Sequence, residues 1–119
     1  MEITRLRGTA QGRNRATAYD NLVFAVATAG SAGPDLQAQT RGTLADIEAA
    51  LTAAGSDKSR LLQATVYLAD ISRKAEMDEV WNQWIGPDPE TWPQRACIGV
   101  ALAPGDLVEI VVVAARNAG

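Results

Sequence analysis

Apart from Asp106 in its turn, two charged side chains stand in a segment that otherwise has the composition of buried β-structure. They are Arg95 and Glu109, in the sequence WPQRACIGVALAPGDLVEIVVVAA that spans residues 92–115. A guanidinium can bind a carboxylate through two parallel hydrogen bonds, and a carboxylate can position or deprotonate a water molecule. If the two groups lie close together, they can bind a small carboxylic acid and direct water at it.

Side chains alternate along a strand, so residues 94–100 would present two faces. One face carries Arg95, Cys97 and Gly99, which together predict a hollow with a cation at its rim. The other face carries three apolar side chains and is expected to face the core: Ala96, Ile98 and Val100.

The face on which Glu109 lies depends on the turn between the last two strands, which we expect to form a hairpin. A two-residue turn within APGD (103–106) would place Glu109 opposite Val100, away from Arg95. Pro-Gly suits a type II turn, which is disfavoured in such hairpins, so a bulge or longer loop is an alternative. One residue of offset would place Glu109 opposite Gly99, on the Arg95 face.

Each of these side chains also has a purely structural interpretation. Arg95 and Glu109 can form an ion pair with each other or with a neighbouring subunit, because structural ion pairs also occupy such positions. Cys97 can pack as a small hydrophobic residue, with only the nearby Arg95 to stabilise a thiolate.

The elements that must carry these side chains follow from the pattern of apolar residues. Alternating and β-branched segments predict strands at 3–6, 15–19, 22–29 and 60–70, followed by two strands within 92–115.

Two amphipathic helices are predicted between the strands. The first runs from Pro34 to Ala54, with Pro34 at its first position and Gly55 as its C-terminal cap. The second begins at a cap on Ser72 and ends near Ile85. The apolar stripes of the two helices are formed by Thr40, Leu44, Ile47 and Leu51 and by Met77, Val80, Trp81 and Trp84, respectively. We interpret both tryptophans as packing residues.

This order of elements predicts an α+β fold in which both helices cover one face of a mixed sheet. The other face is left without cover, so we predict a homo-oligomer. At 119 residues the chain corresponds to a single domain spanning residues 1–119.

Composition excludes several classes of chemistry. The chain has no histidine, which removes Ser/His/Asp and Cys/His catalysis and every His-containing metal site. The lone Cys97 cannot form an intrachain disulfide or a thiolate cluster.

The net charge is −3 and the eleven basic residues are scattered, which argues against nucleic-acid binding. The longest apolar run, 110–115, is too short for a membrane span, and the N-terminus does not resemble a secretory signal, so we expect a cytoplasmic protein.

Two longer stretches resemble the YjgF/RidA family of reactive intermediate deaminases. They are DLQAQTRGTLADIEAALTAAGSDKSRLLQATVYLAD (35–70) and the run that continues to WPQRACIGVALAPGDLVEI (92–110). The resemblance covers roughly Leu22 to the C-terminus, and its specific motifs are P-x-R-x-C…V-E-I and the Q-T-R helix.

The resemblance implies a chorismate-mutase-like subunit that assembles as a homotrimer with ligand clefts between subunits. It also implies hydrolysis of enamines and imines such as 2-aminoacrylate to a 2-keto acid and ammonia, without metal or organic cofactor. Arg95 matches the arginine that clamps the substrate carboxylate, Cys97 the thiol that lines the pocket, and Glu109 the glutamate that orients the attacking water. Backbone groups of Ala27, Thr28 or the strand that carries Cys97 would complete the site.

This sequence departs from the family pattern at three points. Active deaminases usually carry a Pro-Tyr segment before the third strand, where Arg13 falls here and becomes a substrate-binding candidate. They also carry Ser-Gly-Gln at the end of that strand, which here reads AVATA (25–29), and the interval from Arg95 to Glu109 is one residue shorter than usual. These departures favour an alternative function, in which the protein is a non-catalytic member of the family that binds small carboxylates or has a regulatory role.

Overall fold

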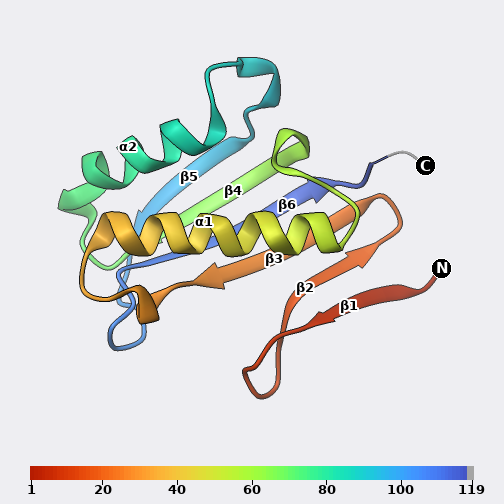
Figure 1. Cartoon of the computed structure of the whole chain (residues 1–119), viewed down its shortest axis with the longest axis horizontal. Coiled ribbons are helices and arrows are strands. Elements are labelled where there is room, and N and C mark those ends of the chain that lie inside the picture. The colour runs from red at the N-terminus through yellow and green to blue at the C-terminus, as the bar shows by residue number, and fades with distance from the viewer. Residues whose placement is uncertain (118–119) are drawn as a thin grey trace.

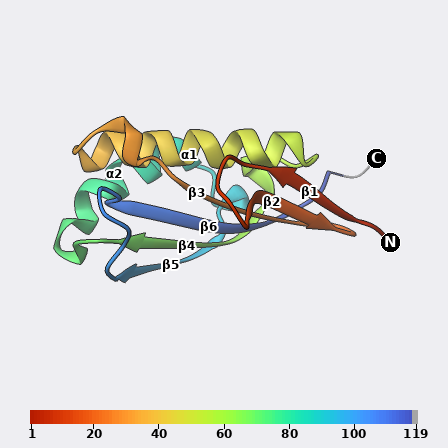
Figure 2. The same cartoon turned by 90° about the horizontal axis from the view of Figure 1, so that it is seen from below.

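The computed structural model describes residues 1–117, which form a six-stranded mixed sheet with two α-helices. The strands lie in the order β1-β2-β3-β6-β4-β5, with these bounds: β1 Ile3–Arg7, β2 Asn14–Tyr19, β3 Leu22–Thr28, β4 Leu61–Leu68, β5 Gln94–Gly99 and β6 Val108–Ala115. Helices α1 (Leu36–Ala53) and α2 (Lys74–Ile85) lie on the same side of the sheet, as Figures 1 and 2 show. The predicted α+β class, with both helices on one face, is confirmed.

Both helical segments begin at an aspartate rather than at the residue predicted from the sequence. The carboxylate of Asp35 accepts a hydrogen bond from an N–H of the first turn of α1, so Pro34 precedes the cap instead of opening the helix. Asp70 accepts from the N–H of Ser72 and caps a 3₁₀ turn at 71–73, from which α2 continues. An ionised carboxylate accepts better than a hydroxyl, and Ser72 therefore lies inside the turn rather than capping α2.

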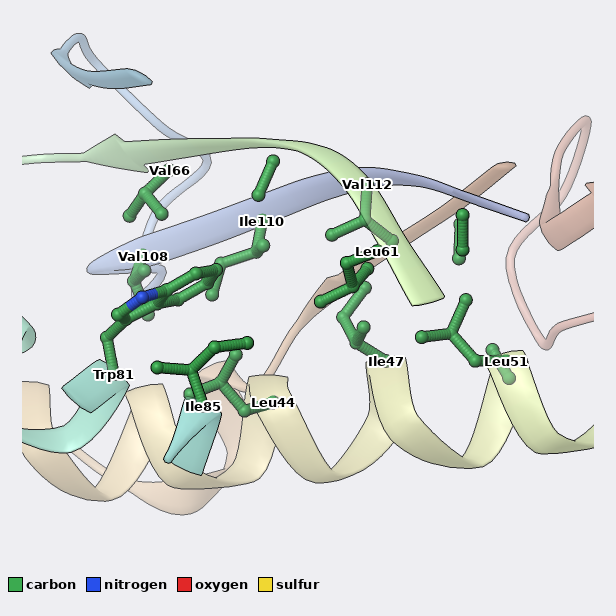
Figure 3. Close-up of a cluster of buried hydrophobic side chains, with 14 of the residues drawn as sticks. Leu44, Ile47, Leu51, Leu61, Val66, Trp81, Ile85, Val108, Ile110 and Val112 are labelled. Atoms are coloured by element: carbon green, nitrogen blue, oxygen red, sulfur yellow. The ribbon is translucent and has the colours of Figure 1, made fainter. Parts of the chain in front are cut away.

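The core lies between the helices and the sheet. Figure 3 shows side chains of α1 and α2 pointing toward side chains of β4 and β6. Those labelled there are Leu44, Ile47, Leu51, Leu61, Val66, Trp81, Ile85, Val108, Ile110 and Val112, and all are buried. Burying each large apolar side chain contributes roughly 1.5–3 kcal/mol, so this layer holds the helices on the sheet.

The last two strands do not form the predicted hairpin. Strand β5 pairs parallel with β4, while β6 runs antiparallel between β3 and β4. Residues 100–107 therefore cross from the edge of the sheet to its centre. The apolar run 110–113 explains the position of β6, because a strand that is apolar at successive positions is best buried between neighbouring strands.

The pairing also reverses the predicted faces of β5. Arg95 lies beside Ala64, which is buried under the helices, whereas Ile98 lies beside Tyr67 on the face without helices. The expectation that Ala96, Ile98 and Val100 face the core is therefore wrong. Alternation separates the two faces of a strand but does not tell which face the helices cover.

The face of the sheet without helices is rich in exposed apolar side chains. Phe24 of β3, Val111 of β6 and Ile98 of β5 expose 41%, 37% and 44% of their surface. This agrees with the predicted uncovered apolar face. Within residues 1–117, no helix has the combination of length and hydropathy needed to cross a membrane.

Candidate functional site

Arg95 lies on the helix-covered side of β5 and is held by α2. Its Nη2 donates to Oδ1 of Asp78 at 2.7 Å, and its guanidinium carbon lies 5.1 Å from the ring centroid of Trp81. Its Nη1 lies 3.8 Å from the sulfur of Met77. The side chains of Arg95 and Asp78 are only 19% and 26% exposed, so this ion pair is largely shielded from water.

Asp78 is the charge that balances Arg95. Its other oxygen, Oδ2, accepts from Lys74 Nζ at 2.7 Å. Partial burial pushes the pKa of Asp78 upward, but the hydrogen bonds from Lys74 and Arg95 outweigh burial and lower the pKa below its ordinary value. The carboxylate is therefore ionised at neutral pH and occupies part of the donor set of Arg95.

The predicted hollow beside Arg95 is filled by protein. A Cβ built on Gly99 would lie 2.8 Å from Cβ of Ile71, so the glycine is required by the close approach of the turn that precedes α2. Burial raises the pKa of the Cys97 thiol, although Arg95 opposes the shift. The thiol is protonated at neutral pH and half-buried beside the guanidinium.

Glu109 lies on the opposite face of the sheet. Its neighbours across the ladder are Thr28 of β3 and Tyr67 of β4. It lines a hollow of about 780 Å³ together with Arg13, Ala27 and Thr28. The hairpin registers considered from the sequence are both wrong for Glu109, because β4 lies between β5 and β6.

The hollow arises where the sheet splits. Strand β2 pairs with β3 from Tyr19 to Ala16 only, while β3 continues to Thr28 beside β6. The β2-facing edge of β3 beyond Ala25 consequently has no strand beside it. In Figure 1 the loop that joins β1 and β2 swings away from the end of β3. Because backbone groups alternate between the two edges of an antiparallel strand, one of the two residues Ala27 and Thr28 presents its N–H and C=O at this free edge, where a ligand can reach them.

A buried glutamine fixes the segment that leads into Glu109. Gln39 of α1 is fully buried, and its Nε2 donates to the carbonyl oxygens of Gly33 and Gly105 at 2.7 and 2.9 Å. Its Oε1 accepts from the N–H of Leu107 at 2.9 Å. The side-chain amide of Gln39 therefore joins the crossover 100–107 to the loop before α1. These hydrogen bonds fix where β6 begins.

The structure therefore divides the predicted site residues into two groups. Arg13, Ala27, Thr28 and Glu109 share the hollow, whereas Arg95 lies on the helix side of the sheet with Cys97. No ion pair joins Arg95 to Glu109 within residues 1–117, since Arg95 pairs with Asp78 instead.

Two residues of importance to the site were missed from the sequence. Asp78 lies next to Met77, at the border of the apolar stripe of α2. A carboxylate in this position is half-buried, and this is the signal from which an ion-pair partner for a basic residue could have been predicted. Gln39 belongs to the Q-T-R motif of the first helix, where an amide on the buried side indicates a hydrogen-bonding role. Residues 1–117 contain no group of three or more Cys, Asp or Glu side chains placed to hold a metal ion.

Comparison with known proteins places this arrangement in a family. The family model described as Endoribonuclease L-PSP matches residues 10–116, nearly the whole chain. The chain belongs to this family, the YjgF/RidA family. A YjgF-family member from Neisseria meningitidis superposes with a TM-score of 0.90 at 33% identity, covering 100% of this chain and 98% of that one. Another, from Mycobacterium tuberculosis, gives a TM-score of 0.85 at 35% identity and covers 96% and 99%.

Two curated YjgF/RidA relatives carry informative names. A RutC family protein from Haemophilus ducreyi is 43% identical over 84 residues, 70% of each chain. TdcF from Escherichia coli K12, provisionally named a reactive intermediate deaminase, is 34% identical over 85 residues, which are 71% of this chain and 66% of TdcF. The YjgF/RidA family thus includes proteins named for deaminating reactive intermediates.

Proposed function

We propose that this protein hydrolyses enamine and imine forms of 2-amino acids to 2-keto acids and ammonia, at sites formed between the subunits of a homotrimer. One observation carries the proposal. The cation suited to a substrate carboxylate, Arg95, and the carboxylate suited to activating water, Glu109, lie on opposite faces of one sheet. One chain cannot present both to a small substrate, but neighbouring copies can, because β5 is an edge strand and the open face is apolar.

The chemistry uses only acid–base groups of the chain. An enamine first tautomerises to its imine, and water then adds to the C=N carbon to give a carbinolamine. The carbinolamine expels ammonia and leaves the C=O of the 2-keto acid. Glu109 would take a proton from the attacking water and return one to the departing nitrogen, while Arg95 holds the carboxylate next to the reacting carbon. Cys97 would line the pocket, and the free edge of β3 at Ala27 and Thr28 would orient the substrate.

The first experiment measures turnover directly. A dehydratase generates 2-aminoacrylate or its four-carbon homologue in situ, and the release of ammonia and keto acid is followed. Arg95→Ala is expected to lower the acceleration at least a hundredfold without changing the oligomer measured by light scattering. Arg73→Ala, which breaks an exposed ion pair with Glu76, is the matched control and should retain activity.

A mixing experiment tests whether the site is shared between subunits. Arg95→Ala and Glu109→Gln proteins, each inactive alone, are unfolded together and refolded as mixed assemblies. If each site takes Arg95 from one subunit and Glu109 from the next, random mixing restores roughly a quarter of the wild-type activity. If the mixture stays inactive while mixed assembly is demonstrated, the shared site is wrong.

One observation favours a second candidate, a protein that binds small carboxylates without transforming them. At the end of β3 the chain reads AVATA (25–29) where active deaminases carry Ser-Gly-Gln, and Arg13 stands where they carry a tyrosine, so groups that catalysis would need are missing while Arg95 is kept. Calorimetry with 2-ketobutyrate beside the turnover assay separates the two functions, because binding without acceleration supports the second.

The description of the family model also raises RNA cleavage. The net charge of −3 favours a small substrate instead. RNA binding whose affinity falls steeply with salt would argue for the nuclease.

A further inference from the structure

The hollow that contains Glu109 has a basic wall. Three arginines of the β1–β2 arm line it: Arg7, Arg13 and Arg15. Arg7 lies at a register shift in the β1–β2 ladder, Arg13 lies in the loop before β2, and Arg15 lies near the start of β2. We call these three residues the arginine wall.

The arginine wall makes no direct ion pair with a carboxylate in the part of the chain that the structure describes. Within residues 1–117 none of the three guanidinium groups forms a salt bridge, whereas Arg73 and Arg95 each do. All three arginines are exposed and lie on one short arm, where their like charges repel one another, and an anion bound among them would relieve that repulsion.

The opposite side of the hollow is acidic. Asp46 comes from α1, Asp106 from the crossover, and Glu109 from β6. None of these carboxylates lies within ion-pair distance of the arginine wall, so the hollow separates a positive side from a negative side. A ligand that fits has an anionic group toward the arginines and an electron-poor or cationic group toward Glu109. A protonated imine with a remote carboxylate has this distribution of charge.

We propose that the arginine wall binds a second carboxylate, so that the substrates are imines of acidic 2-amino acids, that is, four- or five-carbon 2-imino dicarboxylates. This inference rests on the proposed function. Arg95 of a neighbouring copy holds the carboxylate next to the imine, Glu109 acts at the imine carbon, and the arginine wall holds the carboxylate of the side chain. The reaction releases ammonia and a 2-keto dicarboxylate, with water as the only other reactant.

The test compares imines that differ only in the side-chain carboxylate. Amino-acid oxidases, with O₂ as the oxidant, generate imines in situ from aspartate, glutamate or 2-aminobutyrate, and kcat/KM for ammonia release is measured for each. Wild type is expected to prefer the dicarboxylate imines at least tenfold, since charge-assisted hydrogen bonds to carboxylates are strong. The double variant Arg13→Gln/Arg15→Gln should bring the ratio of the two kcat/KM values close to one.

Arg41→Gln is the matched control, because Arg41 is an exposed arginine of α1 outside the hollow and the substitution removes the same charge. It should keep the wild-type ratio. Efficient turnover of the 2-aminobutyrate imine with no preference for the dicarboxylates would overturn the inference and leave the proposed function standing.

A binding measurement decides the inference if no imine is turned over. Calorimetry then compares 2-ketoglutarate with 2-ketobutyrate. Tighter binding of 2-ketoglutarate by tenfold or more, lost in the double variant and kept in Arg41→Gln, supports the arginine wall even though the proposed function fails. Equal affinities would refute it.

Discussion

The ion pair between Arg95 and Asp78 predicts that removing one negative charge will tighten the binding of carboxylates. Asp78→Asn has the same shape and keeps an oxygen that accepts from Arg95 Nη2, so the guanidinium stays in place. Two unit charges about 4 Å apart attract by about 4 kcal/mol at an effective dielectric constant of ~20, most of which repays desolvation. We take the free energy by which Asp78 opposes the binding of a carboxylate to Arg95 to be about 1.4 kcal/mol. Asp78→Asn should therefore bind a 2-keto acid with a Kd about tenfold lower than that of wild type.

The same substitution should lower stability, and the effect depends on pH. The pair is less than a third exposed, so its loss should cost about 1–2 kcal/mol of unfolding free energy at pH 7. Because the pKa of Asp78 is lowered below its ordinary 3.8, this contribution is fully present above pH 3.8 and is lost as the pH falls through the lowered pKa. The unfolding free energy of Asp78→Asn should therefore fall less than that of wild type as the pH is lowered through this range.

The assay is calorimetric titration with 2-ketobutyrate at pH 7, combined with urea unfolding at several pH values. Glu76→Gln is the control, since it removes the same charge from α2 and breaks an exposed pair with Arg73. It should leave the affinity unchanged. A folded Asp78→Asn protein whose affinity is unchanged or weaker would refute the reasoning, because Asp78 would then not compete with the ligand for Arg95.

Two further predictions concern the helix side of β5. Gly99→Ala should lower the free energy of unfolding by about 1–3 kcal/mol in urea titration, because its Cβ would meet Ile71 at 2.8 Å. Gly8→Ala, whose Cβ would have ordinary contacts at 3.7 Å, should change little, and equal stabilities of the two variants would contradict the tight contact. Burial raises the pKa of Cys97 above its ordinary 9.0, so alkylation by iodoacetamide should be slow at pH 7, and its rate should still be rising with pH at pH 9. Rapid modification at pH 7 would show that the thiol is activated.

The elements themselves could be predicted because each has a local signal. The helical spacing from Thr40 to Leu51 identified α1, and the alternating segment 60–70 identified β4. The pairing of the last two strands had no such signal. Sequence neighbours often pair, but β6 joins β3 and β4 because its apolar residues need strands on both sides.

The candidate site was predicted by residue type but not by arrangement. Arg95 and Glu109 were recognised because charges are rare in buried strands. Their separation could not be recognised, because it depends on β4 lying between their strands. Asp78 was missed for a related reason, since its pairing with Arg95 joins residues far apart in the chain and is set by how α2 lies on the sheet.

The position of β6 has a consequence for the order of folding. Every other strand precedes β6 in the chain, yet β6 occupies the centre of the sheet between β3 and β4. Until it is in place, β3 and β4 each present an edge of unpaired backbone N–H and C=O groups, and the two halves of the sheet have no hydrogen bonds to each other. Folding on this topology must wait for contacts between distant parts of the chain, which slows it. A nascent or truncated chain lacking β6 therefore exposes two additional strand edges that can pair with other chains. We expect it to aggregate unless a chaperone binds it.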